Sequence, residues 1–358
     1  MIGPEKIAIA SGGIESVAWI GQGLLADAAS RLLSSSGRFL LVSSPGSRPV
    51  AEKLRGALSG RLVVDLEIDD REESKNLKTV ERIADAALAA GLRRDDAFVA
   101  VGGGVVCDLV GFAAAILLRG VAWSAVPTTT GAMADAAIGG KTGVDHPAGK
   151  NLLGAFHLPS TILIDPVSVS TLSDRDYRSG LVEAFKAAWI ADASLAENGE
   201  ASLGAILARE ERALLDLVAG AVRVKAAIVS SDPREGDRRR LLNFGHTLGH
   251  AFEAAGGYRE LRHGEAVGWG IAAALRISRR RARLSETTAA RITRVLARLG
   301  PFPEPRRDRD TIASYLVRDK KSSARGIAGV LLEELGRARV EEAVPLEAWL
   351  EAAAEASF

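Results

Sequence analysis

The sequence predicts an α/β N-terminal Rossmann-like domain with a parallel sheet (residues 1–166), followed by an all-α C-terminal domain (residues 167–358). Before about residue 165, short apolar or β-branched runs alternate with helical stretches, a pattern typical of parallel βα units with helices on both faces of a sheet. After that point, apolar residues recur at helical spacing and strand candidates are few. A chain of 358 residues has room for two domains.

Five short runs are the expected strands of the first domain. They are rich in apolar and β-branched residues and cover residues 39–43, 61–68, 97–101, 122–127 and 161–166. Between two of them, the stretch KTVERIADAALAAG has the spacing of a connecting helix.

Four long runs are the expected helices of the second domain. Apolar residues recur in them every three or four positions, over 179–191, 211–231, 246–255 and 265–284. The last run includes a basic cluster, RRRAR (279–283). We interpret this cluster as a solvated helix end in preference to an interaction patch.

The composition excludes several classes of protein. Forty-six Lys and Arg residues against forty-five Asp and Glu leave a net charge of +1, so no broad basic field indicates nucleic acid binding. The single cysteine, Cys107, cannot form an internal disulfide. No run of eighteen apolar residues and no signal-like N-terminus occurs. We therefore expect a cytoplasmic protein with a small-molecule partner and no membrane partner.

A glycine-rich turn is the first chemical signal. VGGGVVCDLVGF (101–112) follows a predicted strand and opens a helix. Its glycines allow a ligand to approach the backbone, and the helix N-terminus offers unpaired N–H groups to a phosphate. Such turns are also common as plain structure, so nucleotide binding and a structural turn both remain open.

The second signal is a long segment of small and polar residues, 127–156. Lys141 and Lys150 stand beside glycines, where an ammonium group can reach a small anion, and Thr128, Thr129 and Asn151 add uncharged polar contacts. We predict an ordered functional loop. The alternative is an exposed polar loop whose lysines have no role.

Three of the five histidines fall in one window, 246–263. His246 and His250 are four residues apart and share one face of a helix, and His263 opens the next helix. With a carboxylate, such residues could form a catalytic zinc site. Glu183 is the candidate, followed one turn later by Lys186. Hydrogen-bonded core histidines are the alternative.

Several motifs together resemble 3-dehydroquinate synthase of the sugar-phosphate cyclase superfamily. They are GGGVVCD, PTT, GGKTGVDHPAGKNLLGAF, GLVEAFK, LLNFGHTLGHAFE and HGEAV, which span most of residues 70–270 in order. The resemblance implies a shikimate-pathway enzyme that converts 3-deoxy-D-arabino-heptulosonate 7-phosphate to 3-dehydroquinate and phosphate. It also implies catalytic NAD and a divalent metal, Zn2+ or Co2+. The implied steps are transient oxidation, phosphate elimination, reduction, ring opening and intramolecular aldol closure.

The resemblance also implies roles for individual residues. The implied metal ligands are Glu183, His246 and His263. The implied catalytic and substrate-binding residues are His250, Lys186, Lys225, Arg239, Asn243, Asp135, Arg119 and Lys320. The implied NAD-binding residues are Asp70, Glu72, Lys75, Gly103, Gly104, Val105, Asp108, Thr128, Thr129, Lys141, Lys150, Asn151 and Thr171. Arg119 resembles an arginine that reaches the neighbouring subunit's site, so we expect a homodimer.

The chain departs from the family pattern at a few positions. Ser44 stands where an aspartate often holds the adenine ribose, and Asp145 stands where asparagine is frequent. These departures leave open another sugar-phosphate cyclase, making an amino-dehydroquinate or a cyclitol. A metal-dependent NAD-linked alcohol dehydrogenase and a non-catalytic relative are further alternatives. The two lysines and the intact candidate ligands disfavour both of these.

Overall fold

The computed structural model describes residues 3–11, 13–32, 37–318, 322–323 and 326–358. By its internal contacts the chain divides into two compact units. Unit 1 comprises Met1–Ser173 and Lys225–Arg234, and unit 2 comprises Asp174–Val224 and Glu235–Phe358. Unit 1 therefore takes in a short segment from the second half of the chain. Among the described helices, none is both long enough and apolar enough to cross a bilayer.

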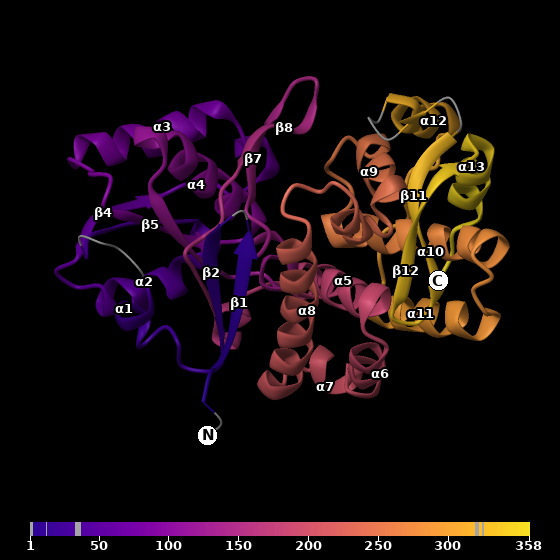
Figure 1. Cartoon of the computed structure of the whole chain (residues 1–358), viewed down its shortest axis with the longest axis horizontal. Helices are drawn as coiled ribbons and strands as arrows, with labels where there is room; N and C mark the ends of the chain where they lie inside the picture. Colours follow the sequence, from indigo (N-terminus) through magenta and orange to yellow (C-terminus); the bar gives the residue numbers. More distant parts are fainter. Residues whose placement is uncertain (1–2, 12, 33–36, 319–321, 324–325) are drawn as a thin grey trace. The chain divides into compact units, whose positions relative to one another are not determined.

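The described part of unit 1 is built on a seven-stranded sheet with the order β1-β2-β9-β6-β5-β3-β4 (Figure 1). The strands are β1 Glu5–Ser11, β2 Ile14–Ile20, β3 Phe39–Ser43, β4 Leu62–Glu67, β5 Ala97–Gly102, β6 Ala122–Pro127 and β9 Thr161–Ile164. All neighbours pair in parallel except β1 and β2, which form an antiparallel hairpin. The predicted α/β class with a mostly parallel sheet is confirmed, and the antiparallel hairpin at its edge was not predicted.

Helices cover the two faces of this sheet. They are α1 Ala28–Arg31, α2 Arg48–Ala57, α3 Leu77–Ala89 and α4 Gly104–Ile116. Phe39, Leu41 and Val99 form a core with Val50 and Leu54 of α2, and Figure 1 shows α3 and α4 on the other side of the sheet. Strands β3 and β5 are buried along their whole length, which explains why they occur in the sequence as continuous apolar runs.

Short elements complete unit 1. A second, two-stranded sheet is the hairpin of β7 Lys141–His146 and β8 Gly149–Phe156. The remaining turns are the helical turns η1 Pro45–Ser47, η2 Glu72–Ser74, η3 Leu117–Arg119, η4 Ala132–Ala136 and η5 Pro166–Val169. The segment 141–156, which we expected to be part of an ordered functional loop, forms a β-hairpin.

Unit 2 is mainly helical, as predicted. Its helices are α5 Asp174–Ala191, α6 Ala193–Ala201, α7 Leu203–Leu207, α9 His246–Ala255, α10 His263–Arg281, α11 Glu286–Leu299, α12 Arg309–Arg318 and α13 Leu346–Glu355, with the turn η6 Arg238–Asn243. Helix α8, Glu211–Ser231, begins in unit 2 and ends in unit 1.

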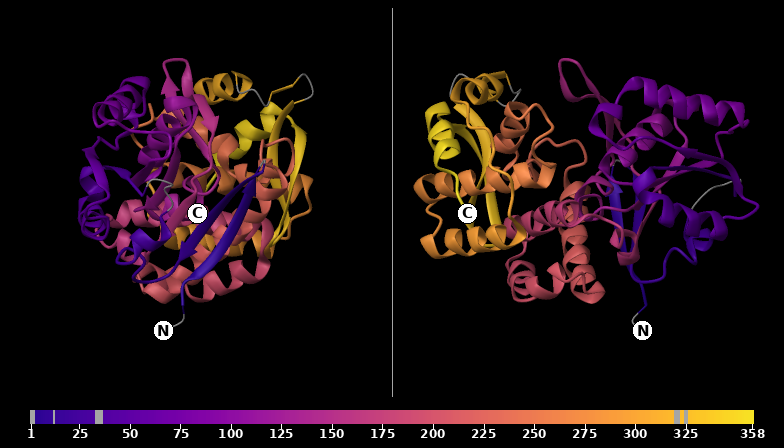
Figure 2. Two further views of the ribbon diagram at one scale, coloured as in Figure 1. Left: turned by 60° about the vertical axis from the view of Figure 1, so that its left-hand side comes forward. Right: turned by 180° about the vertical axis from the view of Figure 1, so that it is seen from behind.

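Unit 2 also contains an antiparallel sheet, which corrects the expectation of an all-α domain. It consists of β10 Ser322–Ser323, β11 Gly326–Glu334 and β12 Arg337–Val344. Figure 2 shows β11 and β12 (yellow) from two further sides. Strand β11 is buried over most of its length, so its sequence lacks the alternation that identifies a half-buried strand.

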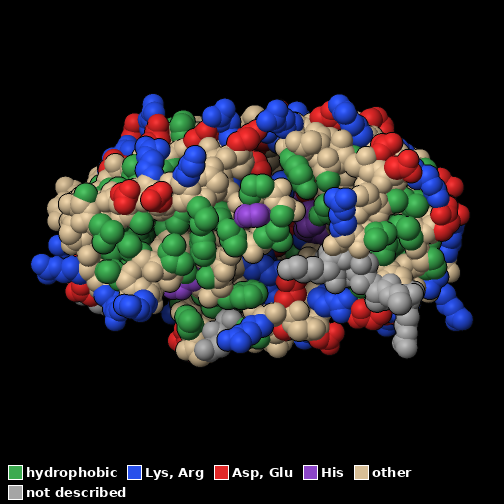
Figure 3. All heavy atoms as spheres, turned by 90° about the horizontal axis from the view of Figure 1, so that it is seen from above, with side chains coloured by type: hydrophobic (Ala, Val, Ile, Leu, Met, Phe, Trp, Pro, Cys, Tyr) green, Lys and Arg blue, Asp and Glu red, His purple; other side chains and the backbone are tan. Residues whose placement is uncertain are grey.

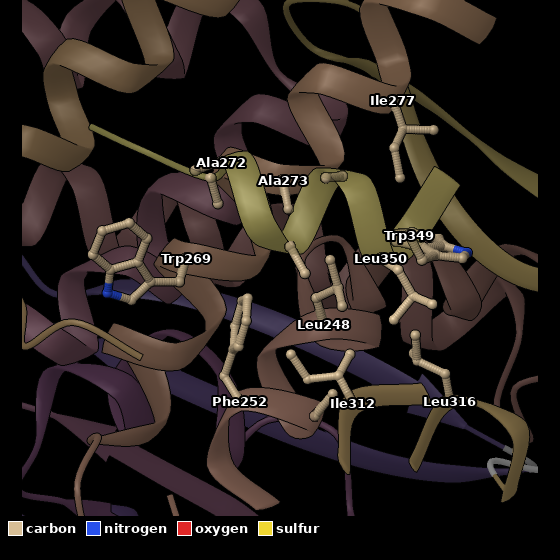
Figure 4. Close-up of a cluster of buried hydrophobic side chains, with 14 of the residues drawn as sticks. Leu248, Phe252, Trp269, Ala272, Ala273, Ile277, Ile312, Leu316, Trp349 and Leu350 are labelled. Carbon is tan, nitrogen blue, oxygen red and sulfur yellow. The ribbon is translucent and has the colours of Figure 1, made fainter. Parts of the chain in front are cut away.

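The core of unit 2 forms around α9 and α10. Leu248 and Phe252 of α9 and Trp269 of α10 pack together with residues of α12 and α13 (Figure 4). These contacts fix α9 and α10 relative to each other, and both helices begin at a histidine.

Charged side chains of both signs lie on the face of the protein drawn in Figure 3. Figure 3 shows Lys and Arg side chains interspersed with Asp and Glu side chains on the visible face. At the end of α10, Arg276, Arg279 and Arg280 pair with glutamates. Arg279 and Arg280 of the basic cluster are thus paired with carboxylates, and Arg281 donates to the carbonyl of Ala343 over 3.3 Å.

Candidate active site

Three side chains from three helices meet in unit 2. Glu183 lies in the middle of α5, and His246 and His263 are the first residues of α9 and α10. Nε2 of His246 is 3.8 Å from Oε1 of Glu183, and Nε2 of His263 is 3.5 Å from the same oxygen. The three donor atoms all lie within 4.8 Å of one another. The candidate ligands, which are far apart in the sequence, thus converge on one point.

The chemistry of these donors fits a divalent cation. The side chain of Glu183 is 3% exposed, and neither carboxylate oxygen has a hydrogen-bond donor among the described residues. The Nζ of Lys186 is in ion-pair contact with Oε2 but does not satisfy hydrogen-bond geometry. Lys186 places its cation at Oε2 only, so a metal ion bound at Oε1 would stabilise a buried oxygen that has no donor among the described residues.

His246 is prepared to act as a ligand. Burial, reinforced by the nearby charge of Lys186, lowers the pKa of His246 well below its usual value, so the ring is neutral at physiological pH. Its Nδ1 lies 3.2 Å from the carbonyl oxygen of Phe244. An Nδ1–H that donates to this carbonyl leaves the Nε2 lone pair directed at the site.

Glycines bring the three helices close enough for these distances. A Cβ on Gly264 would lie 1.8 Å from the carbonyl oxygen of Ser179 in α5, and one on Gly270 would lie 1.9 Å from that of Gly245. Helix α10 therefore packs backbone to backbone against α5 and against the start of α9. The glycines of the HTLGH and HGEAVGWG motifs thus have a structural role that spacing alone did not reveal.

An ion pair further fixes the start of α10. Arg175 of α5 donates from Nε to Oε1 of Glu265 over 2.7 Å, and Oε2 of Glu265 accepts the backbone N–H of Arg262 over 2.7 Å. Glu265 is almost fully buried. The turn that presents His263 is therefore tied to the helix that carries Glu183.

Unit 2 contains further predicted residues, of which His250 lies beside the two candidate histidine ligands. The ring centroid of His250 is 5.2 Å from that of His246 and 5.9 Å from that of His263. Arg239 is buried in η6, and Asn243 donates from Nδ2 to Oε1 of Glu235 over 2.9 Å. Lys320 lies outside the described residues.

A second polar cluster lies in unit 1. Nζ of Lys75 is 2.5 Å from Oδ2 of Asp108 and 2.5 Å from Oδ1 of Asn151, and Nζ of Lys150 is 2.9 Å from Oε1 of Glu72. Burial by itself would lower the pKa of Lys75, but the carboxylate of Asp108 raises it above its usual value. The ammonium group therefore stays charged and ties the β7–β8 hairpin to α4.

The glycine turn has the predicted strand-to-helix geometry. β5 ends at Gly102 and α4 begins at Gly104. A Cβ on Gly103 would lie 3.1 Å from Cγ2 of Thr129, and the backbone N–H of Thr128 donates to the carbonyl of Gly102 over 2.9 Å. The turn is thus closely packed, with Val105 in the first turn of α4.

The remaining predicted residues of unit 1 have different environments. Nζ of Lys225 donates to Oδ1 of Asp135 over 2.5 Å and to its carbonyl oxygen over 2.6 Å. Arg119 is exposed, with a left-handed backbone (φ 65°). Asp70, Thr171 and Lys141 are exposed as well.

Two acidic residues near these sites were not predicted. Glu253 lies 3.5 Å from Nδ1 of His263, and Glu235 accepts from Asn243. Glu253 follows His250 by three residues in HAFE, so helical spacing places it beside that histidine. For Glu235, which precedes η6 in a turn, the local sequence offers no comparable signal.

Comparison with known proteins identifies related families. Residues 65–179 match the family described as 3-dehydroquinate synthase N-terminal, and residues 180–322 match 3-dehydroquinate synthase C-terminal. The 3-dehydroquinate synthase of Pelobacter propionicus is 43% identical over 291 residues, covering 80% of this chain and 81% of the relative.

Two solved structures extend the comparison. A 2-deoxy-scyllo-inosose synthase complexed with carbaglucose-6-phosphate, NAD+ and Co2+ has a TM-score of 0.88 at 25% identity, over 99% of this chain and 100% of that chain. A 2-epi-5-epi-valiolone synthase from Streptomyces hygroscopicus with NAD+ and Zn2+ bound has a TM-score of 0.83 at 30% identity, over 96% and 97%.

Proposed function

The chain belongs to the 3-dehydroquinate synthase family and has that family's activity, and on this premise we propose how its own residues carry the reaction. In this proposal Glu183, His246 and His263 hold the divalent metal, and the polar cluster and glycine turn of unit 1 hold NAD. The reaction converts 3-deoxy-D-arabino-heptulosonate 7-phosphate to 3-dehydroquinate and phosphate.

One observation carries the metal assignment: the buried carboxylate of Glu183 has no hydrogen-bond donor within the described part of the chain and lies beside two imidazole Nε2 atoms. Three protein ligands of this kind leave a coordination position for substrate, the arrangement of a catalytic site. The related structures bind NAD+ together with Co2+ or Zn2+, which supports the same pair of cofactors here.

The cofactors supply the redox chemistry. Bound NAD would supply reversible hydride acceptance at the substrate carbinol, and the metal would supply Lewis acidity that lowers the pKa of a substrate hydroxyl. The chain's own residues bind and orient the substrate. Lys186 places an ammonium group beside Glu183. There it can donate a hydrogen bond to a substrate oxygen on which negative charge develops during the reaction.

The cationic residues that we assign to the substrate suit its negative charge. The substrate has a carboxylate and a phosphate, and charge-assisted hydrogen bonds from lysine and arginine recognise both. In unit 2 we assign Lys186, Arg239 and His250 to the substrate, with Asn243 as an uncharged donor. In unit 1 the charged Lys225, held by Asp135, is assigned to the same role.

The NAD assignment in unit 1 depends on the turn and the cluster. The N-terminus of α4 offers N–H groups behind Gly103 and Gly104, suited to the pyrophosphate. Lys75, Asp108 and Asn151 form a connected polar group, and Lys150 is joined to Glu72. We assign all of these to NAD, together with Thr128 and Thr129.

The test is phosphate release from the seven-carbon substrate with Zn2+ and NAD at a concentration well below that of substrate. We expect several phosphates and several 3-dehydroquinates per NAD, because NAD is regenerated in each turnover. NADH accumulating in proportion to substrate, with no phosphate released, would identify a dehydrogenase. A sugar phosphate without the carboxylate, turned over as fast as the seven-carbon acid, would identify a different cyclase.

A further inference from the structure

His263 lies between two carboxylates. Its Nε2 is 3.5 Å from Oε1 of Glu183, and its Nδ1 is 3.5 Å from Oε1 of Glu253. Glu253 belongs to α9 and its side chain is 6% exposed. The ring thus offers one nitrogen to the proposed metal and the other to a buried acid that no role described so far explains.

His263 needs a partner that orients its ring. Its side chain is 48% exposed and stands at the first position of α10, so packing alone does not restrict its rotation or its tautomer. His246, by contrast, is largely buried and its Nδ1 faces the carbonyl of Phe244. The carboxylate of Glu253 faces Nδ1 of His263 in the same way that the carbonyl of Phe244 faces Nδ1 of His246.

We propose that Glu253 is a positioning residue for His263: its carboxylate accepts a hydrogen bond from Nδ1–H and thereby leaves Nε2 unprotonated and directed at the metal. The inference rests on the metal site proposed above. The physical basis is general, since a carboxylate on the second nitrogen of a ligating histidine fixes the ring and increases its basicity.

A competing arrangement would make Glu253 itself a ligand. The donor atoms of His250, Glu253 and His263 also lie within 4.8 Å of one another. The hydrogen-bond environment of the Glu183 carboxylate distinguishes the two arrangements. Oε2 of Glu183 is in ion-pair contact with Lys186, but Oε1 has no hydrogen-bond donor among the described residues, so an ion at the other position would leave Oε1 with neither a donor nor a bound cation. We therefore place the ion at Glu183. Glu253 then faces the other ring nitrogen of His263, Nδ1.

The experiment measures Zn2+ affinity of the metal-free full-length chain by competition with a chromophoric chelator. Glu253→Ala should weaken binding by about 10- to 100-fold. Glu253→Gln keeps an acceptor oxygen and should lose less. Glu183→Ala should abolish tight binding. Glu260→Gln is the matched control, because it removes the same charge at a position three residues before His263. The carboxylate of Glu260 accepts a hydrogen bond from Nε of Arg306 over 3.0 Å. This variant should bind Zn2+ as tightly as wild type.

Nitrogen NMR of the histidine rings gives a second readout, which a purely structural role for Glu253 would not change. The wild type and Glu253→Gln should show His263 as the Nδ1–H tautomer, and Glu253→Ala should show a mixture of tautomers. If Glu253→Ala does not fold, Glu253→Gln is compared by both measurements: unchanged Zn2+ affinity overturns the proposal, and a smaller affinity with the tautomer retained supports it.

The outcomes separate this inference from the metal site itself. If Glu253→Ala folds and binds Zn2+ as tightly as wild type, Glu253 has no positioning role although the metal site stands. If Glu253→Ala abolishes binding and Glu183→Ala does not, the ion lies at His250, Glu253 and His263, and both the positioning role and the proposed ligand set are wrong. If wild type binds no Zn2+ tightly, the proposed metal site fails first.

Discussion

At the scale of single residues, Glu183 is buried, and neither of its carboxylate oxygens has a hydrogen-bond donor among the described residues, although Nζ of Lys186 is in ion-pair contact with Oε2. The histidines beside it come from two other helices. A divalent ion bound at Oε1 would compensate this carboxylate and join it to the two imidazole nitrogens.

The first prediction concerns metal content. His263→Ala should lose most of the bound zinc measured by elemental analysis, because two remaining protein ligands hold a divalent ion far less tightly than three. His146→Ala, which removes an exposed histidine from the β7–β8 hairpin, should keep the wild-type amount. Stoichiometric zinc in purified His263→Ala would rule out this residue as a ligand.

The second prediction concerns the two hairpin lysines. Lys141→Ala and Lys150→Ala should each lower kcat/KM by at least about tenfold, or roughly 1.4 kcal/mol of transition-state stabilisation. The thermal midpoint should change little, because the ion pair of Lys150 with Glu72 is partly exposed and such pairs contribute about 0–1 kcal/mol.

The control for these lysines is Lys78→Ala, which removes an exposed lysine from α3. Its steady-state kinetics should match those of the wild type. Wild-type kinetics in the two hairpin variants would instead show that these lysines serve neither NAD nor substrate.

At the scale of elements, the approach of α10 to α5 and α9 decides whether the site exists. Side chains larger than hydrogen at Gly264 and Gly270 would overlap backbone atoms of the neighbouring elements. Backbone atoms in a packed core cannot move aside as a flexible side chain can. The helix starts that carry His246 and His263 are thereby held at short range.

The third prediction tests this packing. Gly270→Ala should destabilise the protein by about 1–3 kcal/mol, the usual cost of overpacking. This exceeds the gain of about 0.5–1 kcal/mol from replacing a helical glycine by alanine. Unfolding in denaturant measures the change, and Zn2+ affinity should fall with it, because the clash would separate α10 from His246.

The matched control is Gly204→Ala in α7, where the added Cβ would meet only Nη2 of Arg298, at 4.0 Å. That variant should be as stable as wild type or slightly more stable. Equal effects of the two substitutions would mean that the close approach of the helices is unimportant.

At the scale of the whole molecule, the exposed Arg119 is assigned a role in the site of a neighbouring subunit. Its backbone and that of Leu118 are both left-handed, and the carbonyl of Leu118 accepts a hydrogen bond from Arg94 over 2.7 Å. The carbonyl of Leu118, just after the end of α4, is thus bonded by Arg94 and not by Arg119. Arg119 precedes Lys141 by twenty-two residues. On the resemblance of Arg119 to a subunit-crossing arginine, we propose a homodimer that shares Arg119 between its sites.

The fourth prediction is complementation between two inactive variants. A heterodimer of Arg119→Ala and His263→Ala chains has one site with both defects and one with neither. Activity should therefore return on mixing, to at most about half the wild-type value per dimer. Heterodimers verified by mass spectrometry that remain inactive would contradict the shared site, and so would an active monomer in sedimentation.

Five strands of unit 1 (β3, β4, β5, β6 and β9), the glycine turn before α4 and the helical character of most of unit 2 could be predicted from the sequence alone. These features depend on local periodicity and on residues such as Gly103 whose requirements are local. The β1–β2 and β7–β8 hairpins were not predicted. The resemblance then nominated Glu183, His246 and His263. Local patterns carry no information on which distant segments become neighbours, so the residues alone left both a metal site and a histidine-containing core open.

How these segments meet depends on the tertiary structure. It paired β11 with β12, formed a hairpin from the segment with Lys141 and Lys150, and brought Lys225 to Asp135 across ninety residues. It also placed Glu253 behind His263. Each of these contacts depends on long-range packing, because burial of apolar faces selects the partner of each helix or strand, and only that selection brings a particular acid to a particular nitrogen.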